Sequence, residues 1–139
     1  GPEKGRLTGL IKDYGLEDNV TFVGFVRNHD EVIALMKASK IFASPSVREG
    51  FGMAALEAMA CGLPVVTVNA PKNAVKELVT DMTGIICDPT PESFAEGVLK
   101  CLNSKGSMKE KCKTRSLSFD WEKIVSEEER YYSGIIGNS

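Results

Sequence analysis

Hydrophobic positions along the chain alternate between a helical spacing and short continuous apolar runs. Apolar residues three and four positions apart predict helices over residues 7–14, 29–36, 53–61, 91–102 and 119–135. Short apolar runs, bounded mostly by Gly, Pro or Asn, predict strands over residues 19–23, 41–44, 65–68 and 84–87. A further short helix is predicted over residues 73–79. Helices and strands therefore follow one another several times along the chain.

Several of the predicted helices have recognisable ends. Gly15 stands in the position that ends the first helix, and Asn28 is a good N-cap for the second. Thr90 caps a later helix, in which Pro91 takes the first position and its missing N–H costs nothing. Residues 105–107 are predicted to break the chain before a basic helix. These signals support the assignment made from the hydrophobic spacing.

The alternation of elements indicates the fold class. The predicted strands are short and apolar on both sides, which is typical of a parallel sheet covered by helices on both faces. The expected fold is therefore α/β, with a Rossmann-like doubly wound parallel sheet. Such a sheet binds ligands beyond the carboxyl ends of its strands. These ends are predicted at residues 23–25, 44–46, 68–70 and 87–89.

Length and composition restrict the function further. The chain has 139 residues, enough for about one domain, and a formal net charge of −2, which makes nucleic acid an unlikely ligand class. The apolar runs are far shorter than the ~20 residues of a membrane span. The four cysteines form no C-x-x-C pair and lie far in sequence from the single His29, which argues against a zinc site. Cys61 and Cys87 are interpreted as small buried residues of a reduced, cytoplasmic protein.

The segment with the strongest chemical pattern runs from the end of one strand to the start of a helix. The strand ends at Ser44, a loop with Gly50 and Gly52 follows, and the helix begins near Met53. Glycines allow backbone N–H groups to approach a ligand closely, and the helix N-terminus adds a partial positive charge. This arrangement predicts a cradle for a phosphate group.

Two carboxylates, Glu49 and Glu57, lie on either side of this loop and helix start. Carboxylates repel phosphate but accept hydrogen bonds well from hydroxyl groups. Glu57 is also the only charged residue in an otherwise apolar helix, where a carboxylate without a partner is costly. A ligand with an anionic centre and a hydroxyl-rich ring on each side would match both the phosphate cradle and the two carboxylates. A nucleoside diphosphate sugar has this layout.

Residues 44–66 resemble the signature of the retaining glycosyltransferases of family 4, which have the GT-B fold. The shared features are a Pro-Ser before the loop, then Glu-Gly-Phe-Gly, a second Glu eight residues after the first, and Ala-Met-Ala-x-Gly-x-Pro-Val-Val. Residues 1–3, 15–26 and 83–89 also resemble segments of that family. Residues 73–77 depart from it, because the family's usual two glycines are replaced, although Glu77 aligns.

The resemblance implies a domain organisation. Residues 1–139 would be a nucleotide-sugar-binding domain, the C-terminal half of a GT-B fold, truncated at its N-terminus and lacking the acceptor-binding domain. The helix at about residues 119–135 would be the helix that crosses back to the missing domain, and its exposed face could support dimerisation of the fragment. The whole enzyme is expected in the cytoplasm, with peripheral contact to the inner face of the membrane as an option.

The resemblance also implies roles for single residues. Glu49 would be the catalytic residue and contact hydroxyls of the transferred sugar. Glu57 would accept hydrogen bonds from the ribose hydroxyls. The other implied donor-binding residues are Gly50, Phe51, Gly52 and Met53 around the sugar and distal phosphate, Gly24, Phe25 and Val26 near the base, and Ser46. The family uses a UDP- or GDP-sugar donor and a glycan or lipid-linked acceptor, usually without a metal. Neither a metal nor another cofactor is expected, and the isolated fragment is expected to be inactive.

Three alternatives remain open at this point. The chain could be a non-catalytic module that binds a nucleotide or a sugar. It could be a glycosidase with Glu49 and Glu57 as acid and base, although the glycine loop does not serve that chemistry. It could be a dinucleotide oxidoreductase, but no G-x-G-x-x-G segment opens a helix after a strand.

Overall fold

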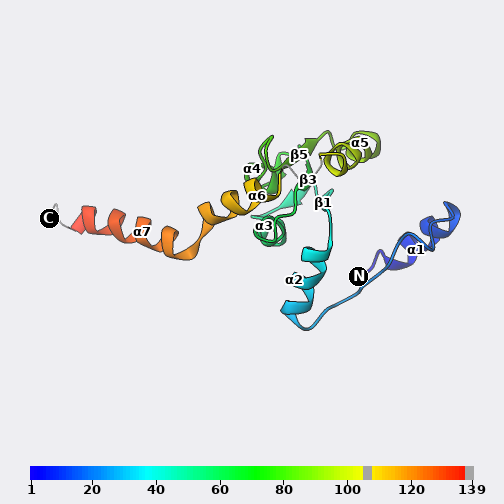
Figure 1. Cartoon of the computed structure of the whole chain (residues 1–139), viewed down its shortest axis with the longest axis horizontal. Helices are drawn as coiled ribbons and strands as arrows, with labels where there is room; N and C mark the ends of the chain where they lie inside the picture. Colours follow the sequence, from blue (N-terminus) through cyan, green and yellow to red (C-terminus); the bar gives the residue numbers. More distant parts are fainter. Residues whose placement is uncertain (105–107, 137–139) are drawn as a thin grey trace.

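The computed structural model describes residues 1–104 and 108–136, so the predicted break at residues 105–107 lies outside the described residues. A central α/β body is flanked by two arms. Figure 1 shows the N-terminal helix α1 at the end of one arm and the C-terminal helix α7 as the other. The helices are α1 (Lys4–Asp13), α2 (His29–Ala38), α3 (Met53–Ala60), α4 (Val75–Leu78), α5 (Pro91–Leu102), α6 (Lys109–Ser116) and α7 (Trp121–Ile136), with a 3₁₀ turn at Leu117–Phe119.

The body is built on a parallel sheet with the strand order β1-β3-β5. Its strands are β1 (Phe42–Ser44), β3 (Val65–Val68) and β5 (Gly84–Cys87). In the register, Phe42 lies opposite Val65, and Val65 lies opposite Gly84. A second parallel pair joins the two-residue strands β2 (Arg48–Glu49) and β4 (Lys72–Asn73). These two strands are too short to leave a periodic pattern in the sequence, which explains why they were not predicted.

Successive residues of the central strand face two separate apolar layers. Val65 packs on one side in a buried cluster that includes residues of α3, α4 and α6. Val66 packs on the other side with Cys87 and Cys101, joined by partly buried residues of α5. Since side chains alternate along a strand, a sheet with both faces covered needs apolar residues at consecutive positions. The doubly covered parallel sheet predicted from the sequence is thus confirmed.

The predicted helix caps are present. The side chain of Asn28 accepts a hydrogen bond from the Asp30 backbone N–H at 3.0 Å, at the start of α2. Thr90 accepts from the Ser93 N–H at 3.2 Å, and Pro91 occupies the first turn of α5. Each cap satisfies a backbone donor that the helix itself leaves without a partner.

The predicted strand over residues 19–23 is wrong. These residues form an extended link from α1 toward α2 without strand pairing, and Phe22 and Val23 are 43% and 57% exposed. Figure 1 shows the link running away from the sheet. A strand is stabilised by hydrogen bonds to a neighbouring strand, and the described part of the chain places none beside this segment. The apolar pattern alone does not create that neighbour.

The last helix lies close to its predicted position and has an exposed apolar face. It spans Trp121–Ile136, and the 3₁₀ turn precedes it. Its aromatic residues are exposed, among them Trp121 at 76% and Tyr131 at 67%. The exposed apolar face expected for this helix is therefore confirmed. No helix among the described residues is long and apolar enough to span a membrane.

The four cysteines are free thiols in different surroundings. Cys87, Cys101 and Cys112 are buried, whereas Cys61 is only half-buried, so the prediction of burial holds for Cys87 and is wrong for Cys61. Cys61 lies just past the last residue of α3, where a helix end faces solvent on one side. Burial, and to a smaller extent the nearby Cys101, raises the pKa of Cys112 to about 11. Burial also raises the pKa of Cys87 and Cys101.

These surroundings predict selective alkylation. At about pH 8 the native chain should take up one equivalent of iodoacetamide, at Cys61, because the thiolate is the reactive form and a raised pKa keeps the buried thiols protonated. Peptide mass spectrometry after a short exposure identifies the modified residue. In urea all four cysteines should react. Labelling of Cys112 before Cys61 in the native protein would contradict the packing described here.

Candidate functional site

The loop with the strongest chemical pattern lies at the carboxyl end of β1, where a ligand site was predicted. The chain leaves β1 at Ser44, pairs as β2 with β4, and enters α3 at Met53. The Ala74 backbone N–H donates to the Glu49 carbonyl oxygen at 3.0 Å, which ties the loop to the segment before α4. The conformation of the loop is therefore stabilised by hydrogen bonds to a neighbouring segment as well as by its own residues.

Gly52 makes the turn from this loop into α3. It is buried, with a φ of 92°, a conformation that side chains other than glycine rarely adopt. A Cβ at this position would lie 2.5 Å from Val75 Cγ2. The positive φ and the close approach of Val75 both require glycine here. The predicted close approach of this backbone to a ligand stays a prediction.

The Glu49 carboxylate folds back over its own loop. Its Oε1 accepts a hydrogen bond from the Gly50 N–H at 3.0 Å, and the residue is half-buried. The same N–H was predicted to face the distal phosphate of a ligand. The Glu49 carboxylate thus takes the backbone donor that an anionic ligand would use.

Glu57 extends from α3 and is partly accessible. Its side chain is 35% exposed, and its Oε1 lies 3.8 Å from Nε2 of His29, the first residue of α2. Among the described residues no other side chain forms an ion pair or hydrogen bond with this carboxylate. His29 was missed as a neighbour of the site, because no sequence spacing links the start of α2 to the second turn of α3.

A buried polar centre behind the loop was also missed. Asn73, 1% exposed, donates through Nδ2 to Thr67 Oγ1 at 2.9 Å and to the Val68 carbonyl at 2.8 Å. Its Oδ1 accepts from the Val75 N–H at 3.1 Å. Thr67 Oγ1 in turn donates to the Ser44 carbonyl at 3.1 Å. This network joins the ends of β1 and β3 to the start of α4, and nothing in the residues around Asn73 distinguishes it from a surface Asn.

Phe51, the aromatic residue of the loop, packs against a phenylalanine that lies just before α7. Phe51, 41% exposed, makes an edge-to-face contact with Phe119 at a centroid distance of 5.9 Å. The Arg115 guanidinium lies 5.0 Å from the Phe119 ring centre and donates to the carbonyls of Glu77 and Leu78. The turn before α7 is thereby connected to the loop. This contact links residues that no local pattern relates.

The remaining predicted site residues are distributed unevenly. Met53, 58% exposed, and Ser46, also exposed, lie on the same loop and helix start as Glu49. Gly24, Phe25 and Val26 belong to the extended link between α1 and α2, where Phe25 is 90% exposed. Figure 1 shows this link well apart from α3, so the structure does not bring these three residues to the loop. Their contact with a base stays a prediction.

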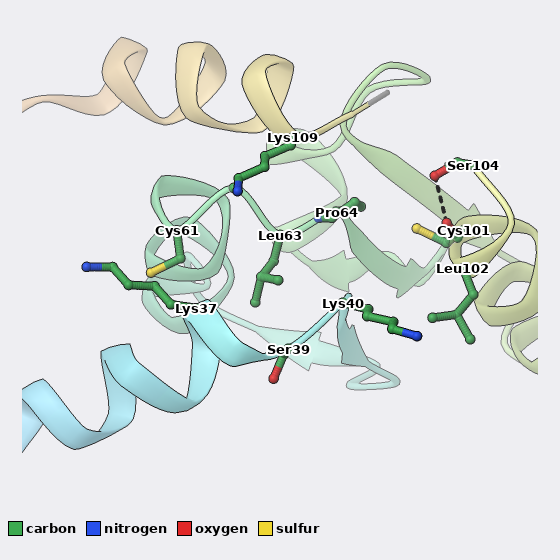
Figure 2. A pocket seen from close by; sticks show the side chains of 11 residues that line it. Lys37, Ser39, Lys40, Cys61, Leu63, Pro64, Cys101, Leu102, Ser104 and Lys109 are labelled. Carbon is green, nitrogen blue, oxygen red and sulfur yellow. Dashed lines mark hydrogen bonds between the residues drawn. The ribbon is translucent and has the colours of Figure 1, made fainter. Parts of the chain in front are cut away.

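A cavity of about 240 Å³ lies at the opposite end of the sheet, beside the residues that precede β1 and β3. Lys37, Lys40 and Lys109 line it, and Figure 2 shows Lys37 and Lys40 pointing in opposite directions. Their ammonium groups therefore do not converge on one ligand. Among the described residues there is also no group of three or more His, Cys, Asp or Glu side chains that could hold a metal ion.

Comparison with known proteins relates this arrangement to a family. The family profile described as glycosyl transferases group 1 matches residues 1–118. The GDP-mannose-dependent alpha-(1-6)-phosphatidylinositol dimannoside mannosyltransferase of Mycobacterium tuberculosis is 31% identical over 131 residues, covering 91% of this chain and 32% of the relative. A Campylobacter jejuni relative, N-acetylgalactosamine-N,N'-diacetylbacillosaminyl-diphospho-undecaprenol 4-alpha-N-acetylgalactosaminyltransferase, is 31% identical over 96% of this chain and 37% of its own length. The chain thus spans about a third of the length of these relatives.

Solved structures show the same relationship. Sucrose-phosphate synthase from Thermosynechococcus elongatus matches with a TM-score of 0.83 and 29% identity, over 100% of this chain and 36% of that protein. The Anabaena protein HepE, solved in complex with UDP and glucose, matches with a TM-score of 0.78 and 27% identity, over 96% of this chain and 38% of its own. The predicted α/β fold, one half of a GT-B architecture, is confirmed. The chain belongs to the family of glycosyl transferases group 1.

Proposed function

We propose that this chain is the donor-binding part of a retaining hexosyltransferase that uses a UDP- or GDP-sugar. The observation that carries the proposal is the loop at residues 48–53, which Gly52 turns into the N-terminus of α3 between Glu49 and Glu57. Two relatives support this donor class: the mycobacterial mannosyltransferase is named as GDP-mannose-dependent, and HepE was solved with UDP and glucose.

The chemistry of the loop suits a diphosphate leaving group. When the bond between sugar and diphosphate breaks, negative charge grows on the phosphate oxygens. The dipole of α3 and the backbone N–H groups at Gly50 and Gly52 would stabilise that charge by electrostatic attraction and hydrogen bonding. Glu49 would leave the Gly50 N–H to the phosphate and turn to the sugar hydroxyls. Glu57 would accept from the ribose hydroxyls, and no metal ion takes part.

The acceptor would be bound by a separate N-terminal domain, with a glycan, a lipid-linked saccharide or a polysaccharide as the acceptor class. The chain covers about a third of its relatives, and their remaining length leaves room for such a domain. In this proposal α7 crosses toward that domain and buries the aromatic residues that are exposed here. In the isolated chain the same face of α7 would favour dimers. The whole enzyme would act in the cytoplasm, with peripheral contact to the inner face of the membrane as an option.

A thermal-shift screen tests the donor class. UDP-, GDP- and other nucleoside diphosphate sugars are compared with NAD and with free sugars. Stabilisation by one nucleotide-sugar series, and not by NAD, is the expected result, because a ligand that binds only the folded state raises its stability. Stabilisation by NAD alone would favour the oxidoreductase alternative, and stabilisation by free sugars alone would favour a sugar-binding module or glycosidase.

The isolated 139-residue chain should transfer no sugar. Transfer requires an acceptor held against the donor and water kept away from the activated sugar, and both would come from closure against the other domain. Release of nucleoside diphosphate from the donor, followed in a coupled assay with and without mixed glycan and lipid acceptors, should equal the rate without protein. Turnover above that rate would contradict the assignment of the acceptor site to another domain.

A further inference from the structure

His29 is the single histidine of the chain and stands beside the predicted ribose carboxylate. It opens α2, which packs against α3, and its Nε2 lies 3.8 Å from Glu57 Oε1. The His29 side chain is 66% exposed and that of Glu57 is 35% exposed. Both side chains are therefore accessible from solvent, and the imidazole lies close to any ligand that binds the Glu57 carboxylate.

The distance between the two side chains leaves the carboxylate available. A separation of 3.8 Å is longer than a hydrogen bond, so the oxygen lone pairs of Glu57 are not used by His29. A protonated imidazole at this distance still attracts the carboxylate by charge. Glu57 can consequently accept from a ligand hydroxyl while His29 modifies the local charge.

Two carboxylates, those of Glu49 and Glu57, place negative charge where a diphosphate is proposed to bind. Glu57 is the only charged residue of α3, and the loop before it contributes one cation and one anion. The charged groups on the elements that meet here are Arg27, Asp30, Glu31 and Lys37 on α2 or just before it, and Arg48 and Glu49 in the loop. Asp30 and Glu31 share the first turn of α2 with His29, where they offset the unfavourable helix dipole for a cation. Glu49 and Glu57 together repel a diphosphate, so a proton on His29 would reduce that repulsion.

We propose that His29 is a charge-compensating residue of the donor site, which in its protonated form offsets the charge that Glu57 places beside an anionic nucleotide diphosphate. The inference rests on the proposed function, because it assumes that the diphosphate lies at the loop before α3. Histidine side chains change charge between about pH 5 and 8. Donor affinity should thus increase as the pH falls through this range.

The experiment measures the affinity of the 139-residue chain for UDP-glucose and GDP-mannose by calorimetry at about pH 8 and about pH 5.5. A nucleotide sugar is the right probe because its two phosphates keep the same charge over this range, whereas a free diphosphate takes up a proton. We expect affinity to rise about three- to fivefold at the lower pH, the size typical of exposed charge pairs. His29→Gln should show the weaker affinity at both pH values, and His29→Arg the tighter affinity at both.

Lys37→Gln provides a matched control, because it removes a positive charge from the last turn of the same helix. This variant should keep the pH dependence of the original chain. Equal affinity of the original chain at the two pH values, or an unchanged rise in His29→Gln, would overturn the inference while the proposed function stands. Absence of nucleotide-sugar binding at both pH values would contradict the proposed function, and the inference with it.

Discussion

Gly52→Ala is expected to destabilise the chain by about 3 kcal/mol and to abolish measurable donor binding. A Cβ would lie 2.5 Å from Val75 Cγ2, so either the loop or α4 must shift. The φ of 92° adds strain, since alanine rarely adopts that conformation. A shifted loop would no longer direct its N–H groups toward the ligand. Urea unfolding and calorimetric titration with the nucleotide sugar measure the two effects.

Gly50→Ala is the matched control for stability within the same loop. No atom lies within 4 Å of a Cβ at Gly50, and this residue is not among the glycines with positive φ. Its unfolding free energy should change by less than about 0.5 kcal/mol. If Gly50→Ala and Gly52→Ala destabilise equally, the loop does not have the geometry described here.

Glu57→Ala is expected to weaken nucleotide binding about tenfold or more, with little effect on folding. A hydrogen bond from a hydroxyl to a charged carboxylate contributes about 1.5–3 kcal/mol, and the truncation removes it. The side chain is 35% exposed, so its loss leaves no buried void. Calorimetry with the nucleoside diphosphate gives the affinity, and thermal unfolding without ligand gives the stability.

Glu96→Ala on α5 is the control for a simple change of net charge, because α5 packs on β3 and β5 at a distance from the loop. It should leave the affinity unchanged. An affinity of Glu57→Ala equal to that of the original chain would refute the ribose contact and leave Glu57 as a surface carboxylate paired with His29.

Much of the fold could be predicted from the sequence because its signals are local. The caps at Asn28 and Thr90 and the apolar run of β3 each depend on residues within a few positions of one another. The strand predicted over residues 19–23 failed for the opposite reason, since a strand exists only when another strand lies beside it. Half-burial of Cys61 could not be read from its apolar neighbours in the chain either.

The candidate site likewise has a part that a local sequence pattern predicts and a part that only the packing of distant elements creates. The glycine loop and the two glutamates form a contiguous pattern, and the structure holds them at the end of β1 and the start of α3. The neighbours that surround this pattern come from elsewhere: His29 from α2, Asn73 from β4 and Phe119 from the turn before α7. Their positions result from packing between elements, so residue spacing carries no trace of them. The predicted base contacts at residues 24–26 depend on the same kind of packing and stay a prediction.

Hydrogen exchange in the presence of a nucleotide sugar tests the central claim most directly. If the loop and the start of α3 bind the diphosphate, amide exchange should slow at residues 50–56 on addition of the UDP- or GDP-sugar identified by thermal shift. It should not change at Lys37, Lys40 and Gly62 around the cavity of Figure 2. Protection confined to that cavity, or unchanged exchange at residues 50–56 under saturating ligand, would contradict the assignment of the donor site.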